Sequence, residues 1–227
     1  MDWKIWYGLY GHPIYKKMIM EKKDLINFWE TCDPVFSHIQ IEDYLGDFES
    51  LTKSWENNFI NKYDFNDKVV VDYGIGGGFL GKYLFATKNI KKYIGFDISA
   101  RQLDEASNNL SGLNVDFYNV NDKETFNDLG ADIFISQAVI QHFPDEKYLI
   151  NFLKNLNDSG IDKVMLQIRY NKKTMFRGDY SQRENVRLAC QTNSNYILGY
   201  LTNYSLVGNK LLEGKSNYEF LFFEKVC

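Results

Sequence analysis

The chain has 227 residues and a formal net charge of −4, with 44% hydrophobic and 25% charged residues. These values are typical of a soluble globular protein with one sizeable core, and the 3 prolines exclude extended proline-rich linkers. The acidic balance argues against nucleic acid as a partner, because proteins that bind phosphate backbones usually carry a basic face.

The three cysteines, Cys32, Cys190 and Cys227, are far apart, and no CxxC or Cys/His spacing typical of a metal site occurs. We interpret them as reduced thiols of a cytoplasmic protein. The N-terminus lacks the basic start and long apolar run of a signal peptide, and no apolar stretch is long enough to span a bilayer. The expected location is therefore the cytoplasm, away from membranes.

The first 65 residues predict amphipathic helices around 13–32 and 47–61, rich in tryptophan and tyrosine. From residue 68 short apolar runs alternate with helical segments, and Ser99 is a plausible N-cap. The expected strands are 68–72, 93–97, 115–119, 131–136 and 163–169. The expected helices between them are 77–86, 99–110 and 145–156. This alternation predicts parallel strands joined by right-handed crossovers.

The C-terminal part departs from that rhythm. A helix is expected near 183–200, followed by strands 204–210 and 218–226, and the short gap between these strands suits a hairpin. The predicted fold is α/β: a Rossmann-like, doubly wound, seven-stranded sheet, mostly parallel, with a C-terminal antiparallel hairpin and an N-terminal helical cap. We expect a single domain over 1–227, with the cap in 1–65 and the core in 66–227.

A glycine cluster follows the first expected strand in the sequence VVVDYGIGGG (69–78). Such a turn lets a ligand approach the backbone closely, although an ordinary tight turn is the alternative. The dinucleotide pattern G-x-G-x-x-G fits only from Gly76, four residues beyond Asp72. The frame that follows the strand at once has Phe79 where the third glycine belongs, so a dinucleotide oxidoreductase is disfavoured.

The segment VVVDYGIGGGFLGKYL resembles motif I of the class I S-adenosylmethionine-dependent methyltransferases. Three further segments resemble motifs of that family in order and spacing: IGFDIS (94–99), VDFYNVND (115–122) and ADIFISQAVIQHFPD (131–145). The resemblance covers about residues 55–227. It implies a methyltransferase that uses S-adenosylmethionine and releases S-adenosylhomocysteine. Tyr73 departs from the pattern by occupying a slot that is often small.

The resemblance also implies the residues that bind the cofactor. Asp97 would hold the ribose hydroxyls, since a carboxylate accepts two hydrogen bonds, although a helix N-terminal charge is the alternative. The remaining candidates would bind the methionine end or the adenine of the cofactor, or belong to the fourth-strand motif. These are Asp72, Gly74, Gly76 and Gly78 for the methionine end, Ile98, Phe117, Asn121 and Asp122 for the adenine, and Gln137 of the fourth-strand motif. Ile98 and Phe117 are equally consistent with plain core positions, and the family usually carries an aspartate where Asn121 stands.

Methyl transfer from a sulfonium is a direct displacement, so much of the catalysis is positioning and desolvation. A hydroxyl acceptor also needs a base, for which His142 is the first candidate, with a structural helix-capping histidine as the alternative. His12 and Tyr180 are the next candidates, while His38 is interpreted as structural. No metal is expected, because no carboxylate cluster follows the fourth-strand motif. That motif also lacks the Asn/Asp-Pro-Pro-Tyr of enzymes that methylate amides or base amines.

A basic segment over 163–187 contains the loop after the fifth strand, where the family resemblance puts the acceptor. Arg169, Tyr170 and Arg177 are the candidates for acceptor binding, because arginine matches phosphate or carboxylate groups, although a solvated surface is the alternative. We expect O-methylation of a small anionic acceptor, such as a phosphorylated or nucleotide-linked sugar of capsule polysaccharide synthesis. N-methylation of a small amine and a non-catalytic cofactor-binding protein stay open, as does a homodimer.

Overall fold

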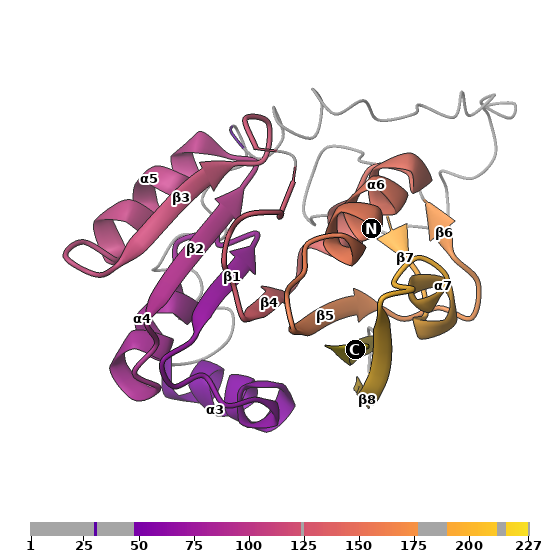
Figure 1. The fold of residues 1–227 in the computed structure, drawn as a ribbon, viewed down its shortest axis with the longest axis horizontal. Coiled ribbons are helices and arrows are strands. Elements are labelled where there is room, and N and C mark those ends of the chain that lie inside the picture. The colour runs from indigo at the N-terminus through magenta and orange to yellow at the C-terminus, as the bar shows by residue number, and fades with distance from the viewer. Residues whose placement is uncertain (1–29, 31–47, 124, 177–189, 213–216, 227) are drawn as a thin grey trace, which may run out of the picture.

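A seven-stranded sheet forms the centre of the computed structural model, which describes residues 30, 48–123, 125–176, 190–212 and 217–226. The strand order is β3-β2-β1-β4-β5-β9-β8, and the pairs from β3 to β5 are parallel. β9 lies antiparallel to both β5 and β8. The strands are β1 Val69–Tyr73, β2 Lys92–Asp97, β3 Val115–Asn119, β4 Ile133–Ser136, β5 Lys163–Arg169, β8 Tyr204–Leu212 and β9 Tyr218–Lys225. The predicted fold class is confirmed (Figure 1).

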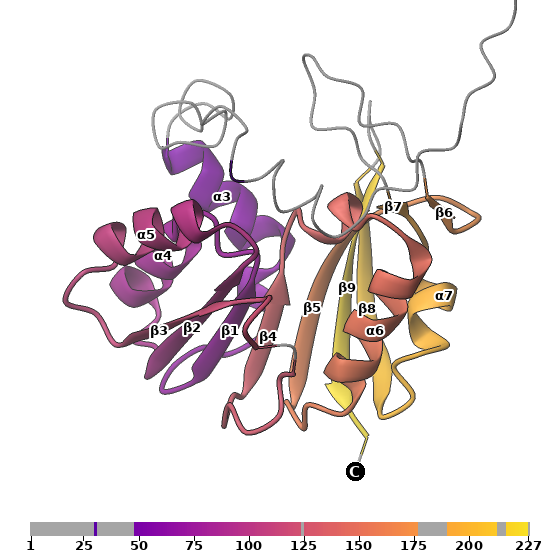
Figure 2. The ribbon, with the colours of Figure 1, turned by 90° about the horizontal axis from the view of Figure 1, so that it is seen from above.

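Helices cover both faces of this sheet. Figure 2 shows α3, α4 and α5 gathered on one side of the molecule and α6 and α7 on the other, and the two buried clusters divide in the same way. The helices are α3 Phe48–Asn58, η2 Ile60–Lys62, α4 Phe79–Thr87, α5 Ala100–Asn109, η3 Ile140–His142, α6 Glu146–Asn157 and α7 Ser194–Leu198. Because both faces are covered, all five residues of β1 are buried, as an apolar run in a parallel sheet predicts.

Aromatic rings fill the core beneath α6. Tyr73 stacks between Phe96 and Phe134 at interplanar angles of 26° and 27°, and its hydroxyl lies 3.2 Å from that of Tyr148. Tyr73 points away from the face that carries α4, because neighbouring residues of a strand point to opposite faces. Tyr73, at a position where the family often has a small residue, is therefore a core residue and points away from the glycine turn.

The N-cap that the sequence suggests at Ser99 forms as expected, and the structure adds a second N-cap at Asp145. The Ser99 hydroxyl accepts the Gln102 N–H at 3.2 Å and begins α5, and the Asp145 carboxylate accepts the Tyr148 N–H at 2.7 Å and begins α6. The expected helix 47–61 is α3 followed by η2. The expected helix 13–32 lies outside the described residues except for Glu30.

Within the described residues, the expected helix 183–200 is confirmed only over Ser194–Leu198 and is wrong at Cys190–Gln191. Cys190–Gln191 forms a short strand, β7, which pairs antiparallel with β6 (Met175–Phe176). The Thr192 N–H donates to the Arg169 carbonyl at 3.0 Å, so this backbone is hydrogen-bonded to the end of β5 instead of to a helical turn. Asn193 then begins α7, which is only five residues long.

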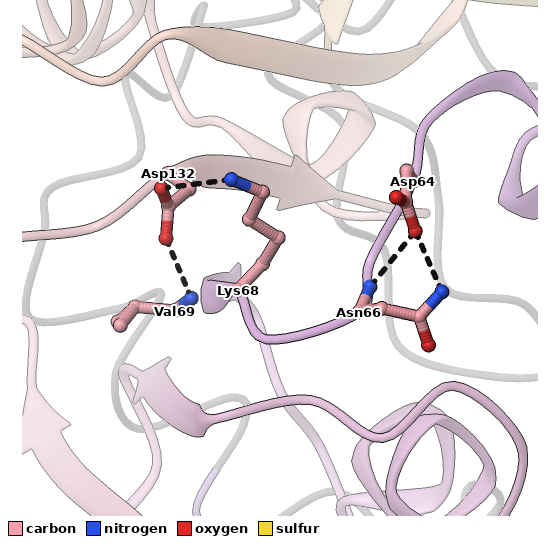
Figure 3. A network of polar contacts seen from close by, with 5 residues as sticks. All are labelled: Asp64, Asn66, Lys68, Val69 and Asp132. Atoms are coloured by element: carbon pink, nitrogen blue, oxygen red, sulfur yellow. Dashed lines mark hydrogen bonds and ion pairs between the residues drawn. The ribbon is translucent and has the colours of Figure 1, made fainter.

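Charged side chains fix the amino ends of the parallel strands. The Asp132 carboxylate, just before β4, accepts the Val69 N–H at 2.8 Å and lies 3.5 Å from the Lys68 ammonium (Figure 3). Nearby, Asp64 accepts the backbone and side-chain N–H groups of Asn66 at 3.0 and 2.8 Å. These acidic residues lie at the edge opposite the carboxyl ends of β1 and β4, so their contacts are structural.

Candidate functional site

A tight glycine turn connects β1 to α4. Gly74, Gly76 and Gly78 have φ angles of 86°, 51° and 80°, in the left-handed region that favours glycine. The Gly74 N–H donates to the Phe96 carbonyl at 2.7 Å, and a Cβ on Gly74 would lie 2.1 Å from Val139 Cγ2. Glycine at position 74 is therefore required both by the backbone conformation and by the space available.

The Asp97 carboxylate joins this turn to the end of β2. Its Oδ2 accepts the Gly76 N–H and its Oδ1 accepts the Ser99 N–H, both at 3.0 Å. Burial raises the pKa of Asp97, whereas these backbone hydrogen bonds lower it. Each carboxylate oxygen can accept a further hydrogen bond. A half-buried carboxylate held in this way can accept two neighbouring hydroxyl groups of a ligand.

Glu30 adds a second carboxylate beside Asp97. Its Oε1 accepts the Ala100 N–H at 2.6 Å, at the first residue of α5. Its charge raises the pKa of Asp97 further. The edge of the sheet between the glycine turn and α5 is therefore acidic, which suits hydroxyl donors and cations better than phosphate.

Asp72 lies inside the sheet, one residue before the end of β1. Its side chain is 4% exposed, and its Oδ2 accepts the Tyr93 hydroxyl at 2.6 Å. Burial raises the pKa of Asp72 to about 7, the Tyr93 hydrogen bond lowers it, and the charge of Asp97 raises it. Asp72 is more buried than the candidates Asp97, Asn121 and Asp122.

The segment expected to face the adenine, 115–122, consists of β3 and the three residues that follow it. The Asn119 side chain donates to the Ile98 carbonyl at 3.3 Å and accepts the backbone and side-chain N–H groups of Asn121 at 2.9 and 2.8 Å. Asn121 and Asp122 are exposed, and Ile98 is half-buried. The fold therefore brings Asp97, Ile98, Asn121 and Asp122 to one edge of the sheet, beside the glycine turn.

The segment after β4 borders the other side of that turn. Gln137 is half-buried, and Ala138 has a φ of 58° with its N–H donated to Gln167 Oε1 at 3.1 Å. His142, in η3, is 7% exposed, and its Nε2 lies 3.2 Å from the Gln141 amide nitrogen. Burial lowers the pKa of His142 to about 3. The imidazole is therefore neutral across ordinary assay conditions.

The candidates for acceptor binding lie at the end of β5. Arg169 and Tyr170 are half-buried there, and the Tyr170 N–H donates to the Asn217 carbonyl at 2.8 Å. β5 pairs with β4, so these residues are on the same side of the glycine turn as His142. Arg177, Tyr180 and His12 lie outside the described residues.

Three buried polar side chains of the sheet were not among the candidates from the sequence. Tyr93 donates to Asp72, and Gln167 accepts the Ala138 N–H. Glu219 on β9 is a third buried polar residue of the neighbouring strands, with its Oε1 bonded to the Asn209 amide at 2.7 Å. Gln167 and Glu219 each have apolar or aromatic residues on both sides in their strands, a sequence signal that points to a buried polar role.

Carboxylate, histidine and cysteine side chains do not gather into a metal site within the described residues, because no group of three of them could hold an ion. The same part of the chain contains no helix long and apolar enough to cross a membrane.

Comparison with known proteins assigns a family to the part of the chain that contains this site. Residues 64–218 match a family model described as a methyltransferase domain. No curated protein matches the chain in sequence.

Solved structures of methyltransferases share the fold. The magnesium protoporphyrin IX methyltransferase of Synechocystis PCC 6803, solved with bound S-adenosylmethionine, is 16% identical, covers 90% of this chain and 96% of its own, and has a TM-score of 0.61. A methyltransferase of Leishmania major is 12% identical, with coverages of 89% and 82% and a TM-score of 0.66.

The tRNA methyltransferase TrmK of B. subtilis is 18% identical and has a TM-score of 0.52. That match covers 73% of this chain but only 63% of TrmK. These identities are too low to carry over an acceptor, so the structures indicate the fold alone.

Proposed function

The chain belongs to the class I S-adenosylmethionine-dependent methyltransferases, and from this premise we propose that it methylates a hydroxyl oxygen of a small anionic acceptor. A phosphorylated or nucleotide-linked sugar, as in capsule polysaccharide synthesis, has the chemistry we expect. Its cofactor is S-adenosylmethionine and the product of that cofactor is S-adenosylhomocysteine.

One observation carries the proposal: the glycine turn lies between two groups of side chains with different chemistry. On the side of β2 and β3 lies the acidic edge with Asp97, which fits a ribose and an ammonium. On the side of β4 and β5 lie His142 and Arg169, which fit an acceptor proton and an anion. An acceptor bound near the second group would approach a cofactor held by the first.

When bound, S-adenosylmethionine would supply an electrophilic methyl group for transfer to the acceptor oxygen, with S-adenosylhomocysteine as the leaving group. The protein's part is to orient the acceptor and to take its proton. His142 is neutral and therefore able to accept that proton, but its low pKa makes it a weak base. Arg169 can orient a phosphate or carboxylate through two parallel hydrogen bonds.

N-methylation of a small amine is the second candidate function, and the burial of His142 favours it. An amine loses its proton to solvent before it attacks, so a weak or absent base costs the reaction little. A nucleic-acid acceptor is disfavoured by the net charge of −4, although one of the similar structures is a tRNA methyltransferase.

The acceptor class can be tested with a cofactor whose methyl carbon is labelled with carbon-13. We expect label transfer to sugar phosphates or nucleotide sugars, with the methyl group bonded to oxygen in the product, as resolved by NMR. Because no metal site is expected, the rate should be unchanged by EDTA. If the label is found on nitrogen, the result supports the amine acceptor instead. If EDTA abolishes the activity and magnesium restores it, the proposal of a metal-independent reaction is contradicted.

A further inference from the structure

Tyr93 and Asp72 form a hydrogen-bonded pair in the core between β2 and β1. Their oxygens are 2.6 Å apart, and the two residues are 0% and 4% exposed. Within the described part of the chain, Tyr93 is the only side chain that donates to Asp72. A phenol that donates to a buried carboxylate stabilises its ionised form, and this effect is stronger in a low-dielectric interior than in water.

The fold leaves the Tyr93 ring little freedom. A Cβ on Gly81 of α4 would lie 2.7 Å from Tyr93 Cε1, so the ring packs directly against the helix backbone. In the β1–β2 pairing Tyr93 is opposite Val70, two residues before Asp72, and residues two apart point to the same face. Tyr93 and Asp72 therefore meet diagonally beneath α4, and the hydroxyl cannot swing away without repacking the core.

We propose that Tyr93 is a positioning residue for the cofactor, whose hydroxyl keeps the Asp72 carboxylate charged and oriented under the glycine turn. In that state the carboxylate attracts the ammonium of the cofactor's methionine end. The inference rests on the proposed placement of Asp72 in the cofactor site. Tyr93 acts through Asp72 and does not itself contact the cofactor.

The charge on Asp72 depends on few groups. Burial raises its pKa to about 7, the Tyr93 hydroxyl lowers it, and Asp97, also on β2, raises it. β4 has the apolar Ile135 in register with Asp72. The buried side chains of α4 are apolar except for that of Tyr83, whose hydroxyl donates to Glu56. The cofactor's ammonium is attracted by the ionised carboxylate, so cofactor affinity falls as the pH drops through the pKa of Asp72. Loss of the Tyr93 hydroxyl raises this pKa and therefore moves the fall in affinity to higher pH.

The test is isothermal titration of S-adenosylhomocysteine into the full-length wild-type and Tyr93→Phe proteins at pH 6, 7 and 9. For a rise of about one unit in the pKa of Asp72, the affinity of the variant should fall about tenfold at pH 6, about fivefold at pH 7 and hardly at all at pH 9. Phenylalanine keeps the ring beside Gly81, and a melting curve checks the fold.

A matched control is Tyr83→Phe, which removes another tyrosine-to-carboxylate hydrogen bond, to Glu56, between α4 and α3. It should leave the affinity unchanged at every pH. A second probe, 5′-methylthioadenosine, has the adenosine but no ammonium, so its binding to Tyr93→Phe should match its binding to the wild type.

Three results would overturn the proposal: an unchanged affinity in Tyr93→Phe, an equal loss at all three pH values, or an equal loss for methylthioadenosine. Asp72→Asn separates this proposal from its premise. If Asp72→Asn keeps the wild-type affinity and pH profile, the placement of Asp72 in the cofactor site fails. If Asp72→Asn flattens the profile but Tyr93→Phe does not shift it, only the role of Tyr93 fails.

Discussion

The Gly74→Ala variant is expected to lose about 2–5 kcal/mol of unfolding free energy and to bind the cofactor poorly. Gly74 has a φ of 86°, which strains any residue that carries a Cβ, and that Cβ would lie 2.1 Å from Val139 Cγ2. The backbone or Val139 must therefore move, and either movement changes the turn. Denaturant unfolding gives the free energy, and titration of S-adenosylhomocysteine gives the affinity.

Gly112→Ala is the matched control for the backbone strain. Gly112 has a φ of 81°, but a Cβ there would meet nothing within 4 Å. It should lose only about 1–2 kcal/mol, with unchanged cofactor binding. Adding Val139→Ala to Gly74→Ala should restore part of the loss. If Gly74→Ala loses no more unfolding free energy than Gly112→Ala, the close contact between the turn and Val139 does not contribute to the cost of a side chain at position 74.

The His142→Ala variant is expected to lower turnover by about 10²–10⁴-fold if His142 is the base, with the effect near the lower end of that range. The reason for the lower end is burial, which lowers the pKa of His142 to about 3 and so reduces its basicity. Cofactor affinity should barely change, because the imidazole would contact the acceptor. Single-turnover rates measured at saturating cofactor separate these two quantities.

Burial also changes the expected pH dependence. An ordinary histidine would give a rate that rises near pH 6.5, whereas a pKa of about 3 moves that rise below the usual assay range. The depressed pKa means that unfolding takes up a proton, so stability should decline as the pH falls from about 6.5 towards 3, and His142→Ala should lack this decline. Near-normal turnover in a folded variant would exclude the base role and favour the amine acceptor.

The parallel sheet could be predicted from the sequence because its signals are local. The apolar run of β1, the glycine turn after it and the Ser99 cap all act within a few residues, and each forms where expected. The C-terminal hairpin likewise follows from a short gap between two strands. The adenine segment and Asp97 meet because parallel strands end at one edge.

The features that could not be predicted depend on contacts between distant residues. The Tyr93–Asp72 bond joins different strands, and β7 forms only because Cys190–Gln191 meets Met175–Phe176. The helical periodicity near residue 190 was misleading for this reason. The burial of His142, which changes its chemistry, follows from packing of η3 against β5 and β7, and no local pattern reveals it.

Calorimetric titration of S-adenosylhomocysteine into Asp97→Ala is the direct test of whether Asp97 and the glycine turn bind the cofactor. Asp116→Ala serves as the control, because Asp116 is an acid of the neighbouring strand β3 that pairs with Lys92. Binding of the cofactor by Asp97 predicts a loss of about 1.5–3 kcal/mol of binding free energy for Asp97→Ala, roughly ten- to 150-fold in affinity, and no change for Asp116→Ala. An unchanged affinity in Asp97→Ala would contradict it.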